Sequence, residues 1–217
     1  MRIRGLTKIY GNLTVYENFD MDLQDGKITC VLGGSGSGKT TLLNCIAKLT
    51  DCSGDLPQVN CAYVFQTPCL IPNLTLRGNL KLVCGDDGAI DRMLDKVRLS
   101  GMGDRYPVSL SGGQAQRVGI ARAFLFGGDI ILMDEPFNSL DLKLKTEIST
   151  LFAGIQKEYN RTALVVTHDV DEALALADRI AVISGGKIVY DAETQKCGGE
   201  FSDKDKIRRE LVSALLA

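Results

Sequence analysis

The stretch KITCVLGGSGSGKTTLLNCIAKL, residues 27–49, decides the fold. It begins as an apolar strand, passes through a glycine-rich turn and continues with apolar residues at helical spacing. The turn, GGSGSGKT at residues 33–40, fits the pattern GxxxxGK[ST] in the strand-then-helix setting that a phosphate-binding loop requires. Glycines let the backbone wrap closely, so that successive N–H groups and the helix N-terminus can face phosphate groups. The stretch therefore predicts a nucleotide site.

Within this loop, two side chains have chemistry of their own. Lys39 adds a cation beside the phosphates, and the Thr40 hydroxyl is the expected ligand of Mg²⁺. The other reading is a chance glycine-rich turn, which the flanking strand and helix argue against. The residues expected to contact the nucleotide here are Gly33, Gly34, Ser35, Gly36, Ser37, Gly38, Lys39, Thr40 and Thr41.

A second apolar strand, IILMDEP, ends in the adjacent carboxylates Asp134 and Glu135. Adjacent residues at a strand end point to opposite sides, so two separate roles are geometrically natural. Asp134 would hold Mg²⁺, directly or through water, and Glu135 would polarise the attacking water as general base. Alone, such a pair is more often a solvated turn; the phosphate-binding loop reverses that preference.

Apolar runs bounded by glycine-rich turns alternate with helical patterns along the chain, which indicates βα units and a largely parallel sheet. Residues 1–8 and 14–22 read as strands before any helix, and DRIAVISGGKIVYD reads as a hairpin that turns at Gly185 and Gly186. Antiparallel strands therefore flank the parallel core.

Two helical segments accompany this sheet within a single domain, residues 1–217. Residues 67–108 carry apolar residues at helical spacing and form a helical insert. Residues 200–217 form a C-terminal helix, which packs on its own domain or, less commonly for such helices, binds a partner. The apolar face expected for that helix consists of Ile207, Leu211, Val212 and Leu215.

Composition narrows the class of protein. With 25 Lys and Arg against 27 Asp and Glu, the chain lacks the basic surplus typical of a nucleic-acid binder, so no nucleic-acid partner is expected. The chain contains neither an apolar run of the length of a spanning helix nor the apolar core of a signal peptide, which predicts a cytoplasmic protein. Seven cysteines with no CxxC pair fit neither a disulfide framework nor a zinc site and are expected to be reduced thiols.

The pentapeptide LSGGQ, residues 110–114, selects one family among phosphate-loop nucleotidases. Ser111 and the Gly112 and Gly113 amides at a helix N-terminus would form a second anion-binding surface. The motif matches the signature of ABC ATPases without a substitution, and the chain resembles that family over about residues 5–190. The resemblance implies that Ser111, Gly112, Gly113 and Gln114 contact the nucleotide. It also implies an α/β P-loop NTPase fold with a mixed central sheet, an N-terminal antiparallel β-subdomain and a helical insert that carries the signature.

Four further features resemble functional parts of this family. Tyr10 resembles the aromatic residue that stacks on adenine, and Gln66 resembles the glutamine that meets Mg²⁺ and the water and reports to the membrane subunits. Residues 139–141, SLD, look like the loop that crosses the dimer interface. His168, the only histidine, looks like the family's γ-phosphate switch, although a lone histidine is more often structural.

The chain also departs from the family pattern. The segment LTDCSGDLPQVNCAY, residues 49–63, is shorter than the two-strand segment of most relatives, so the antiparallel part is expected to be trimmed. The helical insert looks compact, and no regulatory C-terminal domain is expected after the last strands.

The resemblance implies an ATP-binding and ATP-hydrolysing subunit that energises a membrane transporter. The tract from residue 166 to 189 is most similar to importers of the nitrate, sulfonate, taurine and thiamine-precursor group. The alternative is the ATPase of an exporter or of a lipid- or lipoprotein-releasing complex. A chromosome-maintenance ATPase is disfavoured, because no heptads of a coiled-coil arm separate Lys39 from Ser111.

The expected cofactors are ATP and Mg²⁺. The expected partners are a second copy of the chain across ATP, integral membrane permease subunits and an extracytoplasmic substrate-binding protein. The chain would thereby attach to the cytoplasmic face of the cell membrane. Cargo is chosen by subunits outside this sequence.

Overall fold

The strand that leads into the phosphate-binding loop lies inside a six-stranded sheet of order β5-β6-β7-β3-β8-β9. All neighbours pair in parallel except β8 and β9. Every residue of β3 is buried, as expected for a parallel strand covered on both faces. The strands of this sheet are β3 (Ile28–Leu32), β5 (Cys61–Val64), β6 (Ile130–Asp134), β7 (Thr162–Thr167), β8 (Arg179–Ser184) and β9 (Lys187–Glu193).

The structure is a computed structural model that describes residues 1–138, 140–194 and 201–216, with the backbone alone for residues 201–204 and 216. Ser139 of the expected interface loop, Cys197 and residues 200 and 217 of the expected C-terminal helix lie outside the described residues.

A second, antiparallel sheet of order β2-β1-β4 precedes and flanks the first. Its strands are β1 (Arg2–Tyr10), β2 (Leu13–Asp22) and β4 (Ser53–Asp55). The two strands expected near the start of the chain are thus confirmed. Where most relatives are expected to place two strands, the segment from residue 49 to 63 contributes only the three-residue β4 and the start of β5. The antiparallel part is therefore short.

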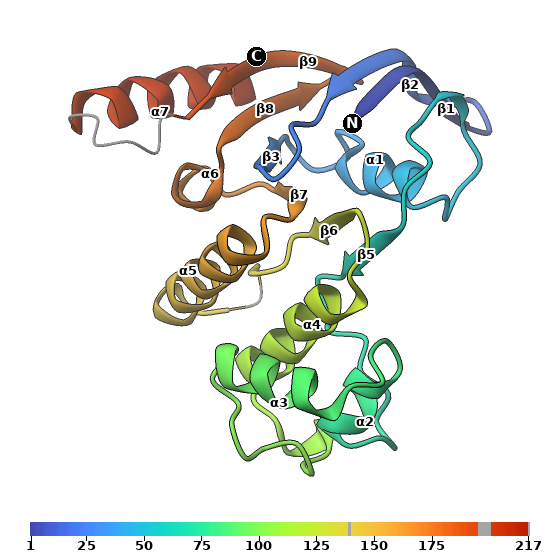
Figure 1. Cartoon of the computed structure of the whole chain (residues 1–217). Helices are drawn as coiled ribbons and strands as arrows, with labels where there is room; N and C mark the ends of the chain where they lie inside the picture. The colour runs from blue at the N-terminus through green and yellow to red at the C-terminus, as the bar shows by residue number, and fades with distance from the viewer. Residues whose placement is uncertain (139, 195–200, 217) are drawn as a thin grey trace.

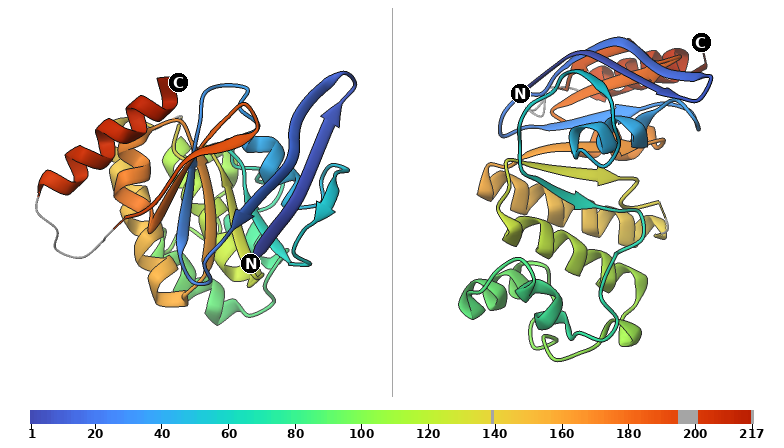
Figure 2. Two further views of the ribbon diagram at one scale, coloured as in Figure 1. Left: turned by 90° about the horizontal axis from the view of Figure 1, so that it is seen from above. Right: turned by 90° about the vertical axis from the view of Figure 1, so that its right-hand side faces the viewer.

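Helices cover both faces of the six-stranded sheet (Figure 1). Alternate residues of β3 divide between two apolar clusters: Ile28, Cys30 and Leu32 pack with residues of α4, α5 and α6, while Val31 packs with α1 and β2. Figure 2 shows α5, α6 and α7 on one side and α1 with the β1–β2 hairpin on the other. The helices here are α1 (Lys39–Ile46), α4 (Gly112–Phe126), α5 (Leu142–Tyr159), α6 (Val170–Leu176) and α7 (Phe201–Leu216).

The segment between β5 and α4 holds two short helices and a turn of 3₁₀-helix. They lie with the start of α4 at the opposite end of the molecule from β1 and β2 (Figure 1). Among the described residues, no helix of the chain is long and apolar enough to cross a membrane. The elements of this segment are α2 (Leu76–Lys81), α3 (Asp87–Lys96) and η1 (Pro107–Ser109).

The hairpin expected near the end of the chain is confirmed between β8 and β9. Gly185 and Gly186 form its turn with φ values of 54° and 73°. A two-residue turn with two positive φ angles suits the right-handed twist of the strands, and glycine adopts it without steric cost.

The prediction of the apolar face of the C-terminal helix is wrong at one position. Leu211 is fully buried, and Ile207 and Leu215 pack against the core, but Val212 is 43% exposed. With 3.6 residues per turn, the residue after Leu211 lies about 100° further around the helix, away from the core. Ala214 packs inward instead.

Candidate nucleotide-binding site

Three neighbouring strands carry the main candidate residues to one edge of the sheet. The loop of residues 33–40 follows β3, Asp134 ends β6, and His168 follows β7. Because β6, β7 and β3 are adjacent and parallel, their carboxyl ends meet at the same edge. In open α/β sheets, this is the place where ligands bind.

The phosphate-binding loop rests on strand β2. Gly38, at the N-cap of α1, has φ 98°, and a Cβ added there would lie 2.8 Å from Val15 Cγ1 and 2.9 Å from the Tyr16 hydroxyl oxygen. Only glycine avoids both the strained φ and these contacts. A Cβ added at Gly34 or Gly36, in contrast, would meet no neighbour within 4 Å, so this side of the loop is open. Loop and helix start thus form a cradle of the kind that accepts phosphate.

Tyr16 was not expected at this place from the sequence. Its ring is fully buried, and its hydroxyl has no hydrogen-bond partner among the described residues. Burial raises the pKa of this hydroxyl far above its usual value. Tyr16 is out of step with the alternation of the buried Phe19 and Met21 in β2, because the pairing of β1 and β2 shifts register between them. Only the tertiary structure shows that Tyr16 is buried and supports the loop.

Lys39 lies inside the loop with only 8% of its surface exposed. Its Nζ donates to the carbonyl oxygens of Gly33 at 2.7 Å and Gly34 at 2.9 Å. Burial lowers the pKa of this ammonium, and the nearby Glu135 and Asp134 carboxylates oppose that shift. The chain thus places one cation among the loop carbonyls and within reach of two acidic residues.

Thr40 and Asp134 meet across the start of α1. The Thr40 hydroxyl donates to Asp134 Oδ1 at 3.1 Å. Burial raises the pKa of the Asp134 carboxyl, and so does Glu135, whereas the hydrogen bond from Thr40 lowers it. A hydroxyl and a carboxylate in contact are oxygen ligands of the type that Mg²⁺ prefers. The two residues therefore fit the metal that the family implies.

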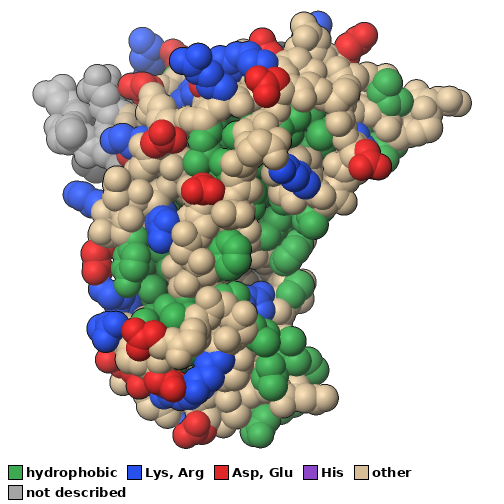
Figure 3. Space-filling model, turned by 45° about the vertical axis from the view of Figure 1, so that its right-hand side comes forward, with side chains coloured by type: hydrophobic (Ala, Val, Ile, Leu, Met, Phe, Trp, Pro, Cys, Tyr) green, Lys and Arg blue, Asp and Glu red, His purple; other side chains and the backbone are tan. Residues whose placement is uncertain are grey.

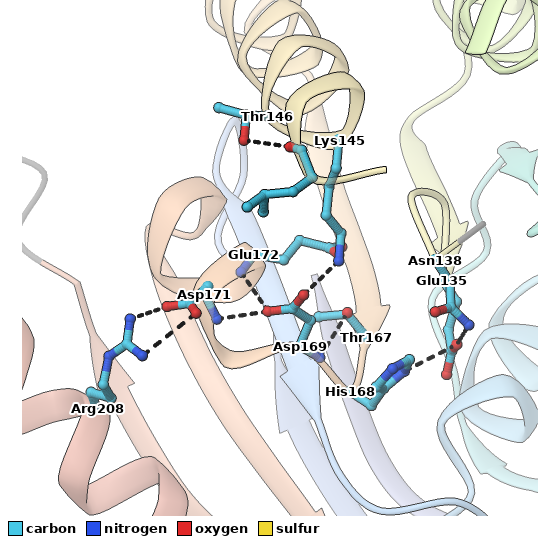
Figure 4. Close-up of polar contacts among 11 residues, drawn as sticks. Glu135, Asn138, Lys145, Thr146, Thr167, His168, Asp169, Asp171, Glu172 and Arg208 are labelled. Atoms are coloured by element: carbon cyan, nitrogen blue, oxygen red, sulfur yellow. Dashed lines mark hydrogen bonds and ion pairs between the residues drawn. The ribbon is translucent and has the colours of Figure 1, made fainter. Parts of the chain in front are cut away.

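Glu135 points toward His168, the residue that follows β7 (Figure 4). Its backbone leaves the strand in the left-handed region, with φ 44°, and its N–H donates to the Val166 carbonyl at 2.9 Å. Glu135 Oε2 accepts from Asn138 Nδ2 at 2.9 Å and lies 3.2 Å from His168 Nδ1. The Asp134 and Glu135 carboxylates contact different partners, as expected. The cause is the left-handed turn at Glu135 after the strand, and not the alternation of side chains along the strand.

Gln66 and Tyr10 lie apart from these contacts. β5 ends at Val64, and Gln66 is exposed two residues beyond that strand. Tyr10 ends β1 with 45% of its surface exposed, and Lys8 Nζ lies 4.3 Å from the centre of its ring. Both side chains are accessible to a ligand.

The LSGGQ motif forms the first turn of α4. Ser111 is the N-cap: its hydroxyl accepts from Gln114 N at 3.3 Å, and the Gln114 side chain accepts from Ser111 N at 3.0 Å. This capping box gives Gln114 a structural role that the motif alone did not indicate. A Cβ on Gly113 would lie 2.5 Å from Leu144 Cδ2, whereas Gly112 faces open space. Figure 1 shows α4 in the lower part of the molecule with α2 and α3, apart from the phosphate-binding loop between β3 and α1.

The loop that follows Glu135 leads into α5. Leu140 is partly buried in the core, and Asp141 is the N-cap of the helix, with its carboxylate accepting from Leu144 N at 3.0 Å. The described part of this loop is thus tied to the helix that contacts Gly113.

The chain is similar to known proteins in sequence and in structure. The family model described as "ABC transporter" matches residues 16–138. The aliphatic sulfonates import ATP-binding protein SsuB of Mycobacterium sp. (strain MCS) is 40% identical over 228 residues, which cover 98% of this chain and 92% of that protein. The sulfate/thiosulfate import ATP-binding protein CysA of Synechocystis sp. is 36% identical over 207 residues, which cover 86% of this chain but 58% of that protein.

Solved structures show the same fold. The dimeric structure of MJ0796, an ABC transporter cassette, superimposes with a TM-score of 0.76 at 30% identity and covers 88% of this chain and 97% of that chain. The residues that match the family, 16–138, include the phosphate-binding loop and the acidic pair. The chain therefore belongs to the ABC transporter family, in which it is an ATP-hydrolysing subunit.

Proposed function

We propose that this chain energises a membrane importer by hydrolysing ATP between two copies of itself. The observation that carries the proposal is the convergence of Lys39, the Thr40–Asp134 pair and the Glu135–His168 pair at one edge of the sheet. These groups cover phosphate binding, metal binding and proton transfer.

The chain's own residues would each have a separate role in the reaction. Backbone N–H groups of residues 33–41 and the Lys39 ammonium hold the phosphates. Water attacks the γ-phosphorus, the bond to the β–γ bridging oxygen breaks, ADP leaves, and the water proton passes to Glu135. His168, held beside Glu135, contacts the γ-phosphate. Mg²⁺, when bound by Thr40 and Asp134 with Gln66, neutralises phosphate charge.

A second copy of the chain would complete each site. Ser111 starts α4 far from the phosphate-binding loop of its own chain (Figure 1), so we infer that Ser111, Gly112, Gly113 and Gln114 face nucleotide bound by the partner. Tyr10 would stack on the adenine. Two chains related by a two-fold axis then form two equivalent sites. The solved relative reported above is dimeric.

An exposed apolar surface next to Gln66 suits a membrane subunit. Figure 3 shows hydrophobic side chains gathered along the hollowed side of the molecule. Exposed apolar residues near this segment include Phe65, Ile71, Leu82 and Phe126, and a pocket of about 120 Å³ lies between Tyr63 and Phe126. Contiguous exposed apolar surface marks partner sites. Gln66 would link such a partner to the nucleotide.

Import is the direction supported by the curated relatives, whose names describe sulfonate and sulfate import; nothing among them favours an exporter. The chain would form a single domain over residues 1–217, with its helical insert at 67–108. It would work at the cytoplasmic face of the membrane, together with permease subunits and an extracytoplasmic substrate-binding protein. No nucleic-acid partner is proposed.

Mixing two inactive variants tests the shared site. Lys39→Ala disables the phosphate-binding loop and Ser111→Arg blocks the signature, so heterodimers would contain one doubly damaged site and one intact site. We expect partial recovery of ATPase activity on mixing, and none when each variant is mixed with itself. No recovery despite demonstrated heterodimers would reject the shared site.

Vesicles containing the permease subunits distinguish import from export. With this chain and Mg-ATP on one side, an importer accumulates cargo on the side where ATP is hydrolysed, and an exporter depletes it there. Movement away from that side would establish the exporter alternative.

A further inference from the structure

One ammonium group joins α5 to the residue that follows His168. Lys145 Nζ lies 2.5 Å from Asp169 Oδ2 and 3.3 Å from Glu172 Oε2 (Figure 4). The side chain of Lys145 is 18% exposed and that of Glu172 only 2%. The Asp169 side chain is 32% exposed, so the ammonium joins one partly buried and one deeply buried carboxylate, and both pairs are screened less than a fully exposed ion pair.

Hydrogen bonds hold both the side chain and the backbone N–H of Asp169. Its Oδ1 accepts from the N–H groups of Asp171 and Glu172, at 2.9 Å and 3.1 Å, and so caps α6. Its own N–H donates to Thr167 Oγ1 at 3.1 Å. That last bond spans His168, which therefore sits in a backbone loop closed by its two neighbours.

Lys145 is equally fixed at its own end. It lies in the first turn of α5, and its N–H donates to the carbonyl of Asp141, the N-cap, at 2.8 Å. The ammonium therefore connects the start of α5, and the loop before it, to the loop that presents His168.

We propose that Lys145 is a positioning residue for ATP hydrolysis, which acts by holding Asp169 so that His168 stays beside Glu135. The inference rests on the proposed role of His168 and adds a residue to it. Its chemistry is simple: the cation removes the freedom of one carboxylate, and the carboxylate fixes the backbone next to the histidine.

A different role for Lys145 is to neutralise the buried Glu172 carboxylate. Burial raises the pKa of Glu172 to about 7, and the Lys145 ammonium opposes that rise, while Asp169 adds to it. Removing the cation alone would leave two carboxylates facing each other, which destabilises the fold. Replacing Glu172 by glutamine at the same time removes that penalty, so the two roles can be separated.

The decisive experiment is a double-mutant cycle on the full chain, with steady-state ATPase activity on Mg-ATP and melting temperatures. Lys145→Met should lower kcat by about ten- to a hundredfold, with KM for ATP within about twofold, because a small misplacement of a reacting group costs that much. Lys145→Arg, which keeps the cation, should retain most activity. In the His168→Ala background, Lys145→Met should cause no further loss.

If Lys145→Met alone folds poorly, the double variant Lys145→Met/Glu172→Gln still tests the role of Lys145 in hydrolysis. It should melt like the wild type and still show the low kcat. Lys157→Met, an exposed lysine in the last turn of the same helix, is the matched control and should leave kcat unchanged.

Three results would overturn the inference: wild-type kcat in Lys145→Met/Glu172→Gln, additive losses of Lys145→Met and His168→Ala, or a loss in KM alone. If His168→Ala has wild-type turnover, the proposed role of His168 fails first, and the role of Lys145 fails with it. If His168→Ala is impaired and the losses add, only the role of Lys145 fails.

Discussion

His168 Nδ1 lies 3.2 Å from Glu135 Oε2, although the two residues follow different strands. The contact exists because β6 and β7 are parallel neighbours, and because Glu135 turns out of its strand with a positive φ. The candidate base and the candidate γ-phosphate contact are therefore one hydrogen-bonded unit. Changes to either should affect turnover more than nucleotide binding.

Glu135→Gln should leave ATP binding intact and abolish steady-state turnover. A general base contributes typically 10²–10⁴-fold, so its loss should raise the barrier by about 3–5 kcal/mol, while Lys39 and the loop still hold the phosphates. Turnover and ATP affinity are measured on the same preparation. Residual turnover above roughly a tenth of wild type would reject Glu135 as the base.

His168→Ala should slow hydrolysis and change the affinity for ADP little, because ADP lacks the phosphate that the histidine is proposed to contact. ATPase rates, ADP titrations and melting curves together decide the matter. A tenfold loss of ADP affinity combined with a lower melting temperature would show that His168 is structural.

Gly113→Ala should be less stable than Gly112→Ala by roughly 1 kcal/mol, because its Cβ would lie 2.5 Å from Leu144 Cδ2 and force that partly buried side chain to move. Gly112→Ala is the matched control in the same motif, since a Cβ there meets open space. We expect it to change the free energy of unfolding by less than about 0.5 kcal/mol. Denaturant unfolding of both variants makes the comparison, and equal stabilities would contradict the packing of α4 on α5.

Glu172 should make the fold less stable as pH rises from about 4.5 to about 7. Its folded-state pKa of about 7 exceeds the usual value, so within this window the folded chain keeps a proton that the unfolded chain releases. The unfolding free energy of wild type relative to Glu172→Gln should thus fall by up to about 3 kcal/mol across the window and stay level above it. Parallel curves for wild type and Glu172→Gln would refute the shift.

The sequence predicts local features of this molecule well, because each is encoded in a short stretch. The strand, loop and helix of residues 27–49, the acidic pair after β6 and the turn at Gly185 and Gly186 all follow from adjacent residues. The direction of Glu135 does not follow, since nothing in IILMDEP indicates that it leaves the strand in the left-handed region.

Contacts between distant segments are what the sequence leaves open. Lys145 reads as a solvated lysine on an amphipathic helix, and Glu172 reads as an acidic residue in the first turn of a helix. Only the packing of α5 against α6 brings them together and buries Glu172. Likewise, Tyr16 is out of phase with the alternation of Phe19 and Met21 in β2, so the sequence pattern shows neither its burial nor that its hydroxyl lies under Gly38.

The position of β3 also bears on how the chain acquires its activity during synthesis. Ile28 pairs with Ala163, and Thr29 pairs with Arg179, so both neighbours of this strand come late in the chain. The phosphate-binding sequence is made before either neighbour, so its strand cannot join the sheet until residues 162–184 have been made. Such long-range pairing must close a large loop and is slow. We therefore expect the nucleotide site to form on a nascent chain only after β7 and β8 have emerged.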